Sequence, residues 1–261
     1  MRAIGVIPAR WGSTRFEGKI LANINGKPMI EHVWRRSRRS RLLKEVIIAC
    51  DDDRILKAAK AFGAKAVLTS KDHASGTDRV AQAVADVLAD IIVNIQGDEP
   101  LIHHSVIDSL VTALSKDPDC LMATAIKLIR TKEELENPNV VKAVIDAAGN
   151  ALYFSRSVIP YDRDRTGIRK VRYYKHLGIY AYRKSFLLKF KDMPKSRLEQ
   201  AEQLEQLRAL EAGVKIKTVL TDIETIGVDT PQDLARVEKI LRPRDRELVE
   251  QRIRKGTKDR S

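Results

Sequence analysis

The sequence is poor in cysteine, in aromatic residues and in long apolar runs, and each shortage excludes a class of protein. Its 261 residues include two cysteines, Cys50 and Cys120, and neither has a second Cys or a His at zinc-ligand spacing. A disulfide scaffold and a zinc finger are therefore excluded, and two free thiols fit a reducing cytoplasm. No apolar run approaches the roughly 20 residues of a membrane span, and the N-terminus lacks the features of a signal peptide. We therefore expect a cytoplasmic protein without stable membrane insertion.

Positive charge, in contrast, is abundant, since 48 Lys and Arg residues face 35 Asp and Glu residues, a formal net charge of +13. Much of it lies in two runs, at residues 35–41 and in a basic C-terminal tail at 242–261. Aromatic residues make up 5% of the chain and do not interleave with either run, which argues against a stacking platform for single-stranded nucleic acid. We interpret both runs as solvated faces and expect no nucleic-acid partner. A basic nucleic-acid-binding protein stays as a distant alternative.

Strand and helix signals alternate through the first half of the chain. The helix that begins near Pro28 has a proline near its first turn, and the next helix ends at Gly63, both typical helix punctuation. Strands are predicted at 4–7, 45–50, 66–68 and 91–95, with the later helices at 54–62 and 77–89. This alternation is typical of an α/β fold with a doubly wound, mainly parallel sheet flanked by helices.

The second half is richer in strand signals. A hairpin is expected where Gly149-Asn150 separates two apolar runs. Strands are predicted at 121–128, 140–146, 151–154, 176–183 and 215–220, and helices at 196–212 and 230–241. We expect one domain over 1–241. Within it, a nucleotide-binding body spans about 1–120 and 215–241, and a smaller β-rich lobe spans about 121–214.

The loop at 8–19 follows the first predicted strand and is rich in glycine and positive charge. Glycines let backbone N–H groups approach a phosphate, and Arg10, Arg15 and Lys19 would neutralise it. The loop is not a Walker A motif, because Ile20 rather than Ser or Thr follows the Gly-Lys pair. The pattern predicts a phosphate-binding loop, with a basic surface loop as the alternative.

Two aspartates stand at element boundaries. Asp98 follows the apolar strand at 91–95, where a carboxylate can hold a magnesium ion that bridges substrate phosphates. Asp229 precedes a helix with Thr230 as its N-cap and Pro231 in its first turn. Ordinary turn and helix-start chemistry explains either aspartate equally well, so the pattern alone leaves their role open.

Two further segments carry polar side chains that suit ligand recognition. The segment 70–79 is dense in hydroxyl and charged groups, which suits recognition of a base or a sugar, although Thr77 is also a typical helix-cap residue. His176 stands at the start of a predicted strand, where a lone histidine is more often structural than functional.

Taken together and in order, seven segments closely resemble the 3-deoxy-manno-octulosonate cytidylyltransferases, or CMP-Kdo synthetases. They are Pro-Ala-Arg-x-Gly-Ser-Thr-Arg, Ser-Gly-Thr-Asp-Arg, Gln-Gly-Asp-Glu-Pro, Ala-Leu-Tyr-Phe-Ser-Arg, His-Leu-Gly-Ile-Tyr, Leu-Glu-Gln-Leu-Arg and Gly-Val-Asp-Thr-Pro. The resemblance runs from about residue 4 to residue 241. It implies a Rossmann-like nucleotide-diphospho-sugar transferase fold with a dimerisation lobe, and hence a homodimer.

The resemblance also implies a reaction and a set of residues. CMP would pass from CTP to 3-deoxy-D-manno-octulosonate (Kdo), with Mg²⁺, giving CMP-Kdo and pyrophosphate for lipopolysaccharide biosynthesis. The implied catalytic residues are Arg10, Lys19 and Asp98, and the magnesium ligands are Asp98 and Asp229. The implied nucleotide-binding residues are Ala9, Arg10, Ser13, Lys19, Ser70, Ser75 and Gln96. The implied sugar-binding residues are Arg156, His176, Tyr180, Glu205 and Gln206.

Two departures from the family pattern bear on the loop and on the sugar. Phe16-Glu17-Gly18-Lys19-Ile20 stands where the family usually has Leu-Pro-Gly-Lys-Pro, and loss of both prolines is expected to loosen the loop. The charged segment 162–172 looks shorter than in some members and would border the sugar site. CMP activation of a related acid sugar, 8-amino-Kdo or sialic acid, is therefore kept as an alternative.

Overall fold

The computed structural model describes residues 1–12, 16–168 and 170–242. Its strands are β1 (Ala3–Ala9), β2 (Asn23–Ile24), β3 (Lys27–Pro28), β4 (Leu43–Cys50), β5 (Lys65–Leu68), β6 (Ile91–Asn94), β7 (Met122–Leu128), β8 (Lys142–Ile145), β9 (Ala151–Ser155), β10 (Tyr174–Arg183) and β11 (Ile216–Leu220). Its helices are η1 (Lys19–Leu21), α1 (Met29–Ser37), α2 (Asp53–Ala61), α3 (Gly76–Val84), α4 (His104–Lys116), α5 (Lys132–Glu136), α6 (Lys184–Phe190), α7 (Arg197–Glu202), α8 (Gln206–Glu211) and α9 (Pro231–Ile240).

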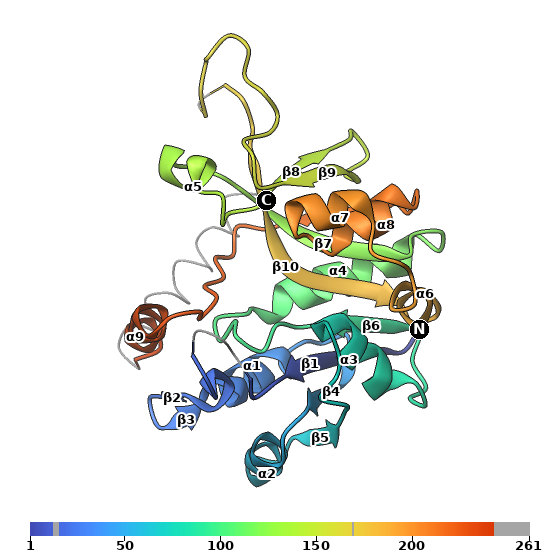
Figure 1. Ribbon diagram of the computed structural model, residues 1–261, viewed down its shortest axis with the longest axis vertical. Coiled ribbons are helices and arrows are strands. Elements are labelled where there is room, and N and C mark those ends of the chain that lie inside the picture. The colour runs from blue at the N-terminus through green and yellow to red at the C-terminus, as the bar shows by residue number, and fades with distance from the viewer. Residues whose placement is uncertain (13–15, 169, 243–261) are drawn as a thin grey trace.

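One mixed sheet of nine strands organises the chain (Figure 1). Seven of them follow the order β11-β7-β10-β6-β1-β4-β5, and the β8–β9 hairpin attaches to β10. Along this order only β10 runs against the others, because it pairs antiparallel with both β6 and β7. The α/β fold with a mainly parallel sheet, predicted from the alternation of strands and helices, is confirmed.

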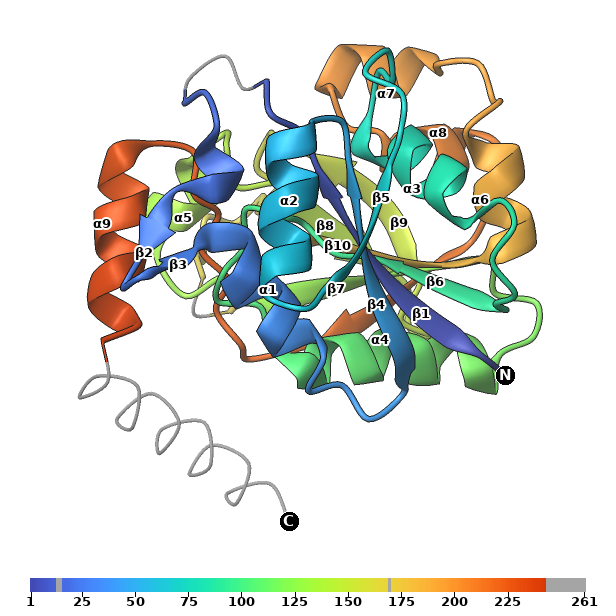
Figure 2. The same ribbon diagram turned by 90° about the horizontal axis from the view of Figure 1, so that it is seen from below.

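Helices cover both faces of the sheet (Figure 2). Ile7 and Val93 face a core that they share with α1, α2 and α4. Val6 and Ile92 face the opposite core, which they share with α3, α6 and α8. A central strand buried on both faces has no polar side, which explains the continuous apolar run at 91–95.

Two predicted helices differ from their sequence pattern, since one ends early and the other is interrupted. The helix predicted at 77–89 ends at Val84. Beyond it, the Lys184 ammonium donates hydrogen bonds to the carbonyl oxygens of Ala85, at 2.9 Å, and of Val87, at 2.7 Å, in place of helical N–H groups. The helix predicted at 196–212 is broken into α7 and α8 by Gln203, which has a left-handed φ of 54°. The break buries Leu204 and brings Glu205 toward α3.

The β-rich segment 121–214 is continuous with the main sheet, since β7 and β10 lie in it and the β8–β9 hairpin extends it. The long loop between β9 and β10 projects beyond the sheet (Figure 1). This segment also contains α5 and α6, and neither they nor α4 were predicted from the sequence. Its part in sugar binding and dimerisation stays a prediction.

The predicted basic tail lies outside the described residues, apart from Arg242. Within the described ranges, no helix is both long enough and apolar enough to cross a membrane.

Candidate active site

An open cleft of about 600 Å³ lies where β1 and β6 end. Open α/β sheets bind ligands at this edge, beyond the carboxyl ends of their parallel strands. Seven of the predicted site residues line the cleft: Ala9, Arg10, Lys19, Ser75, Gln96, Asp98 and Asp229. Segments far apart in the chain therefore meet here.

The predicted phosphate loop leaves β1 and is held from two sides. The backbone N–H of Trp11 donates to Asp51 Oδ1 at 2.9 Å, and the Arg54 guanidinium lies 3.5 Å from the centre of the Trp11 ring. Gly18 adopts a φ of +65°, and a Cβ there would come within 2.8 Å of that ring. Only glycine fits both conditions. Ser13, a predicted nucleotide-binding residue, lies outside the described residues.

Glu17 and Ile20 occupy the positions where the family usually has prolines. The Glu17 carboxylate accepts from the Trp11 indole N–H at 2.9 Å, and the Ile20 side chain is buried in the core. Both side chains therefore add contacts that tie this end of the loop to the fold.

Lys19 joins the two aspartates that the resemblance assigns to magnesium. Its Nζ donates to Asp98 Oδ2 at 2.8 Å, to Asp229 Oδ1 at 3.0 Å and to the Val228 carbonyl at 3.0 Å. Burial lowers the pKa of Lys19, but the charges and hydrogen bonds of both aspartates outweigh burial and raise it above its ordinary value. Lys19 is therefore a firmly protonated cation at the cleft.

Backbone contacts fix the two aspartates relative to each other. The N–H of Val228 donates to the carbonyl of Asp98 at 2.9 Å, and the Val228 side chain is fully buried. Thr230 and Asp233 form a capping box that starts α9 directly after Asp229. Gly97 is required beside Asp98, since a Cβ there would lie 2.9 Å from the Pro8 carbonyl oxygen.

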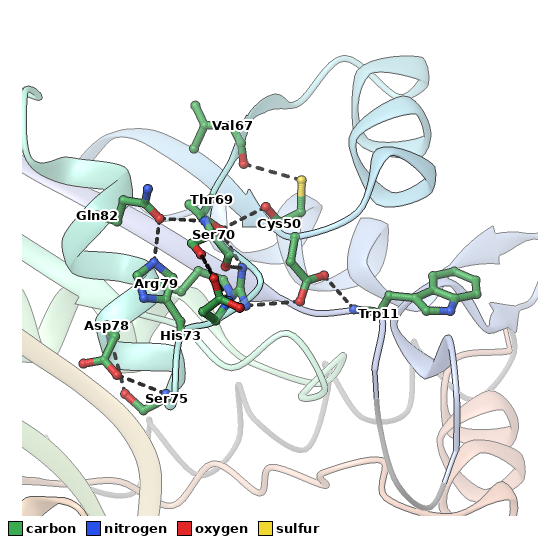
Figure 3. A network of polar contacts seen from close by, with 12 residues as sticks. Trp11, Cys50, Val67, Thr69, Ser70, His73, Ser75, Asp78, Arg79 and Gln82 are labelled. Carbon is green, nitrogen blue, oxygen red and sulfur yellow. Dashed lines mark hydrogen bonds and ion pairs between the residues drawn. The ribbon is translucent and has the colours of Figure 1, made fainter.

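The turn that opens α3 forms a further wall of the cleft. Ser75 is the N-cap of α3, and its capping box with Asp78 directs Ser75 and Gly76 toward the cleft. Ser70 lies behind them, and its carbonyl accepts a hydrogen bond from Arg79 at 3.1 Å (Figure 3). His73, which lines the cleft, bonds Gln82 Oε1 through Nε2 at 2.5 Å.

Arg79 is a nearly buried cation beneath this turn, 2% exposed. It donates to Thr69 Oγ1 at 2.6 Å and to Asp51 Oδ2 at 3.1 Å (Figure 3). Burial lowers the pKa of Arg79, the charge of Asp51 opposes that effect, and the nearby charge of Arg10 adds to it. Arg10 and Arg79 thus give the cleft two neighbouring positive charges, which suits a polyanionic ligand.

Three of the predicted sugar-binding residues, His176, Tyr180 and Glu205, lie close to one another. The rings of His176 and Tyr180 lie 5.3 Å apart, and the Glu205 charge adds to burial in raising the pKa of Tyr180. His176 Nε2 bonds Thr124 Oγ1 at 2.9 Å. Loss of solvent lowers the pKa of His176 to about 3, so the imidazole is neutral at physiological pH.

The other two predicted sugar residues differ in their surroundings. Gln206 follows Glu205 and is 3% exposed, and its Nε2 has no hydrogen-bond partner among the described residues. Arg156 is anchored to backbone, since it donates to the carbonyls of Glu202 at 2.8 Å and of Pro138 at 3.2 Å. Glu202 is the last residue of α7, so Arg156 is linked through this helix to the break that precedes Glu205.

Comparison with known proteins identifies the family of this chain. A family model described as "Cytidylyltransferase" matches residues 4–216. A 3-deoxy-manno-octulosonate cytidylyltransferase of Solibacter usitatus is 51% identical over 241 residues, 92% of this chain and 95% of the relative. The chain belongs to this family. A relative of the same name from Geobacter sulfurreducens is 50% identical over 91% of this chain and 98% of its own.

A solved structure of CMP:2-keto-3-deoxy-manno-octonic acid synthetase complexed with CTP is 45% identical to this chain. It superposes with a TM-score of 0.88 and covers 92% of this chain and 98% of the other. This cytidylyltransferase thus shares its overall fold with a relative that was solved in complex with CTP.

Sequence reasoning missed several polar residues at the site. Asp51 and Arg79 join the phosphate loop to the turn before α3, and Thr77 donates to Glu205. Glu99 lies beside Asp98, and its Oε2 is buried without a partner among the described residues. Burial and the Asp98 charge raise the pKa of Glu99 to about 8. Arg79 and Thr77 stood within a recognised motif, but only folding reveals their partners.

The donor set at Asp98 and Asp229 fits magnesium in this cytidylyltransferase. Within the described ranges, no cluster of three or more His, Cys, Asp or Glu side chains could hold a metal by itself. Magnesium commonly takes one or two carboxylates and completes its shell with phosphate oxygens and water. Asp98 and Asp229 supply two carboxylates beside the predicted phosphate loop, which is the ligand set that magnesium usually takes from a protein.

Proposed function

We propose that the protein transfers CMP from CTP to Kdo, giving CMP-Kdo and pyrophosphate, and so prepares Kdo for lipopolysaccharide biosynthesis. The observation that carries the proposal is the junction of Lys19 with Asp98 and Asp229, beside Arg10, in the cleft at the sheet edge. Cationic side chains suit a triphosphate, and paired carboxylates suit the divalent ion that accompanies it. The names of relatives about 50% identical over more than nine-tenths of the chain support Kdo as the acceptor.

Magnesium is the proposed cofactor, with Asp98 and Asp229 as its protein ligands. When bound, it would neutralise phosphate charge and lower the pKa of a hydroxyl close to it. The remaining ligands would be phosphate oxygens and water, as is usual for this ion.

The chemistry is a direct displacement at the α-phosphorus of CTP. The anomeric hydroxyl oxygen of Kdo forms a bond to that phosphorus while the bond to the bridging oxygen breaks. Pyrophosphate leaves with the electron pair, and the hydroxyl proton passes to solvent. Arg10 and Lys19 would stabilise the negative charge that develops on the phosphates. Gln96 lines the same cleft and would lie between nucleotide and sugar. No covalent enzyme intermediate is needed, so the configuration at phosphorus inverts.

The sugar acid would be held by groups that can exchange hydrogen bonds with its hydroxyls. His176 is neutral, so its imidazole offers one donor and one acceptor, and Glu205 offers acceptors beside Tyr180. Gln206 brings a buried amide that lacks a partner within the described part of the chain. The guanidinium of Arg156 would form an ion pair with the carboxylate of the sugar acid.

A panel of acceptors tests the proposal. The enzyme is incubated with CTP, Mg²⁺ and either Kdo, 8-amino-Kdo or sialic acid, and pyrophosphate release is measured. We expect the highest kcat/KM with Kdo and loss of turnover when a chelator removes the metal. A higher kcat/KM with another acid would identify that acid as the acceptor. Turnover that persists with the chelator would show that magnesium is not the required cofactor. Net retention with a chiral α-thiophosphate would require a covalent intermediate.

We also propose that the enzyme works in the cytoplasm as a homodimer. Cys50 and Cys120 are both buried free thiols, which fits a reducing compartment. Exposed apolar side chains on the β8–β9 hairpin and the following loop, Leu152 and Tyr161 among them, support a dimer contact there. Sedimentation of the wild type and of Leu152→Lys tests it: a dimer that persists unchanged in the variant would exclude this surface.

A further inference from the structure

Glu205 is held by a residue that the proposed chemistry does not yet use. The hydroxyl of Thr77 donates to Glu205 Oε2 at 2.5 Å, across 128 positions of sequence. Thr77 is 3% exposed, so water does not compete for the bond. A short hydrogen bond to a carboxylate in a shielded place is stronger than an exposed one, and it restricts the rotation of the side chain.

The position of Thr77 in α3 gives the bond its significance. Thr77 is the second residue of the helix, directly after Ser75 and Gly76, which line the nucleotide cleft. The Ser75–Asp78 capping box fixes the backbone of this turn from the nucleotide side. One helical turn therefore touches the nucleotide cleft with two residues and the Glu205 carboxylate with the next.

The surroundings of Glu205 explain why it needs such a support. Gln203 breaks the helix just before Glu205, so the helical hydrogen bonds of α7 do not continue through this point. Burial raises the pKa of Glu205, and hydrogen bonds from Thr77 and Ser75 oppose that rise. The hydroxyl of Thr77 therefore favours the ionised carboxylate, which is the form that accepts hydrogen bonds from sugar hydroxyls.

We propose that Thr77 is the positioning residue that orients Glu205 toward the sugar acid and ties it to the nucleotide-binding turn. The proposal rests on the proposed function, because Glu205 is a sugar contact only if the acceptor is bound beside Tyr180. Each carboxylate oxygen accepts more than one hydrogen bond, so the bond from Thr77 leaves Glu205 able to bind substrate hydroxyls.

The test compares Thr77→Val, which keeps the shape and removes the hydroxyl, with Thr77→Ser, which keeps the hydroxyl. We expect Thr77→Val to raise the KM for Kdo about tenfold, equivalent to about 1.4 kcal/mol, and to change the KM for CTP less than about twofold on the same scale. Thr77→Ser should restore the KM for Kdo. Equal KM values for Kdo in wild type and Thr77→Val, equal increases for both substrates, or failure of serine to rescue would each overturn the proposal.

A matched control separates positioning from a general loss of stability. Ser40 donates to Asp108 Oδ1 at the same 2.5 Å, on the opposite face of the sheet, where α1 and α4 pack. Ser40→Ala removes a comparable hydroxyl–carboxylate bond, lowers the melting temperature and should leave both KM values unchanged. If Thr77→Val does not fold, Thr77→Ala removes the same bond and replaces it in every comparison.

Two further readouts belong to a positioning role alone. In a Glu205→Gln background, Thr77→Val should add no further increase to the KM for Kdo, whereas additive effects would contradict the proposal. The acid limb of kcat/KM for Kdo should move to higher pH in Thr77→Val, because the carboxylate loses a donor; an unmoved limb counts against it. The ionisable groups around Glu205 are Arg208 on α8, Asp78 on α3, and Tyr180 and Tyr182 on β10.

Wild-type turnover keeps this test separate from the proposed function. If the wild type does not convert Kdo, the proposed function fails and the role of Thr77 falls with it. If the wild type converts Kdo and Thr77→Val does so with an unchanged KM, only the inference about Thr77 fails.

Discussion

Replacement of Lys19 by methionine is expected to make the nucleotide-free protein bind a divalent cation more tightly. The Lys19 ammonium has three N–H donors, and Asp98, Asp229 and the Val228 carbonyl accept from them. A metal ion that binds the same two carboxylates has to displace part of this network. Lys19 can bind a nucleotide phosphate only if it releases one of these partners. Release of the aspartates by Lys19 would in turn leave their carboxylates available to the metal ion.

The magnitude follows from the contacts and from their exposure. A hydrogen bond to a charged group contributes about 1.5–3 kcal/mol when it is shielded from water. The side chains of Lys19, Asp98 and Asp229 are 14%, 33% and 58% exposed, so solvent screens a good part of each interaction. A net cost of about 1–2 kcal/mol for displacing the ammonium predicts a dissociation constant about 5- to 30-fold lower in Lys19→Met.

Manganese is the probe, because Mn²⁺ accepts the same oxygen ligands and its free concentration is read by electron paramagnetic resonance. Lys65→Met is the matched control: it removes an ammonium 2.9 Å from Glu45, away from the cleft, and should leave Mn²⁺ affinity unchanged. Adding Asp98→Asn to Lys19→Met should abolish the gain. An affinity in Lys19→Met that equals or falls below that of the wild type would refute the reasoning.

Three other substitutions follow from the same structure. Asp98→Asn should keep the fold by circular dichroism and lower pyrophosphate release about 100-fold or more, since it removes a charge beside the reacting phosphates. His176 has a folded pKa of about 3, below its unfolded value, so the stability it contributes is lost as pH falls from about 6.5 toward 3. In urea unfolding, the difference in unfolding free energy between wild type and His176→Gln should therefore narrow as pH falls, by at most about 1.4 kcal/mol per pH unit. Lys142 is fully buried and donates to three backbone carbonyls. Lys142→Met should therefore lower the unfolding free energy by about 3 kcal/mol. As a control, Lys191→Met, which removes an exposed ion pair with Asp192, should lower it by less than about 0.5 kcal/mol.

The meeting of the predicted nucleotide-binding residues in one cleft could be predicted, because several of them follow strand ends. Lys19 and Asp98 follow β1 and β6, and parallel neighbours in a sheet place their carboxyl ends at one edge. Asp229 comes from the far end of the chain, and a capped helix start after it was readable from Thr230 and Pro231. Sequence spacing could not show that one ammonium would join both aspartates, because that contact depends on how the last helix packs.

The arrangement of the predicted sugar-binding residues depends on contacts that no local sequence pattern contains. β10 runs antiparallel between β6 and β7, so the neighbours of Tyr180 were not predictable from alternation of strands and helices. Gln203 carries no glycine or proline signal, yet its left-handed conformation ends α7 and sets the direction of Glu205. The partners of Arg79 and Thr77 lie on other elements, and burial of a cation or a hydroxyl follows from them. Tertiary packing overrode local propensity at each of these points.

The segment between β11 and α9 shows how the fold keeps Asp229 in place without regular structure. Glu224 accepts from Lys175 at 2.7 Å and also pairs with Lys127, so the segment is fixed to β10 and β7. Burial raises the pKa of Glu224, but hydrogen bonds from both lysines outweigh it and hold the pKa below its ordinary value. Val228 then fills the core and bonds the backbone of Asp98. These anchors involve no substrate, so Asp98 and Asp229 are held in place before CTP binds. The entropy cost of ordering the segment therefore does not reduce the free energy of CTP binding.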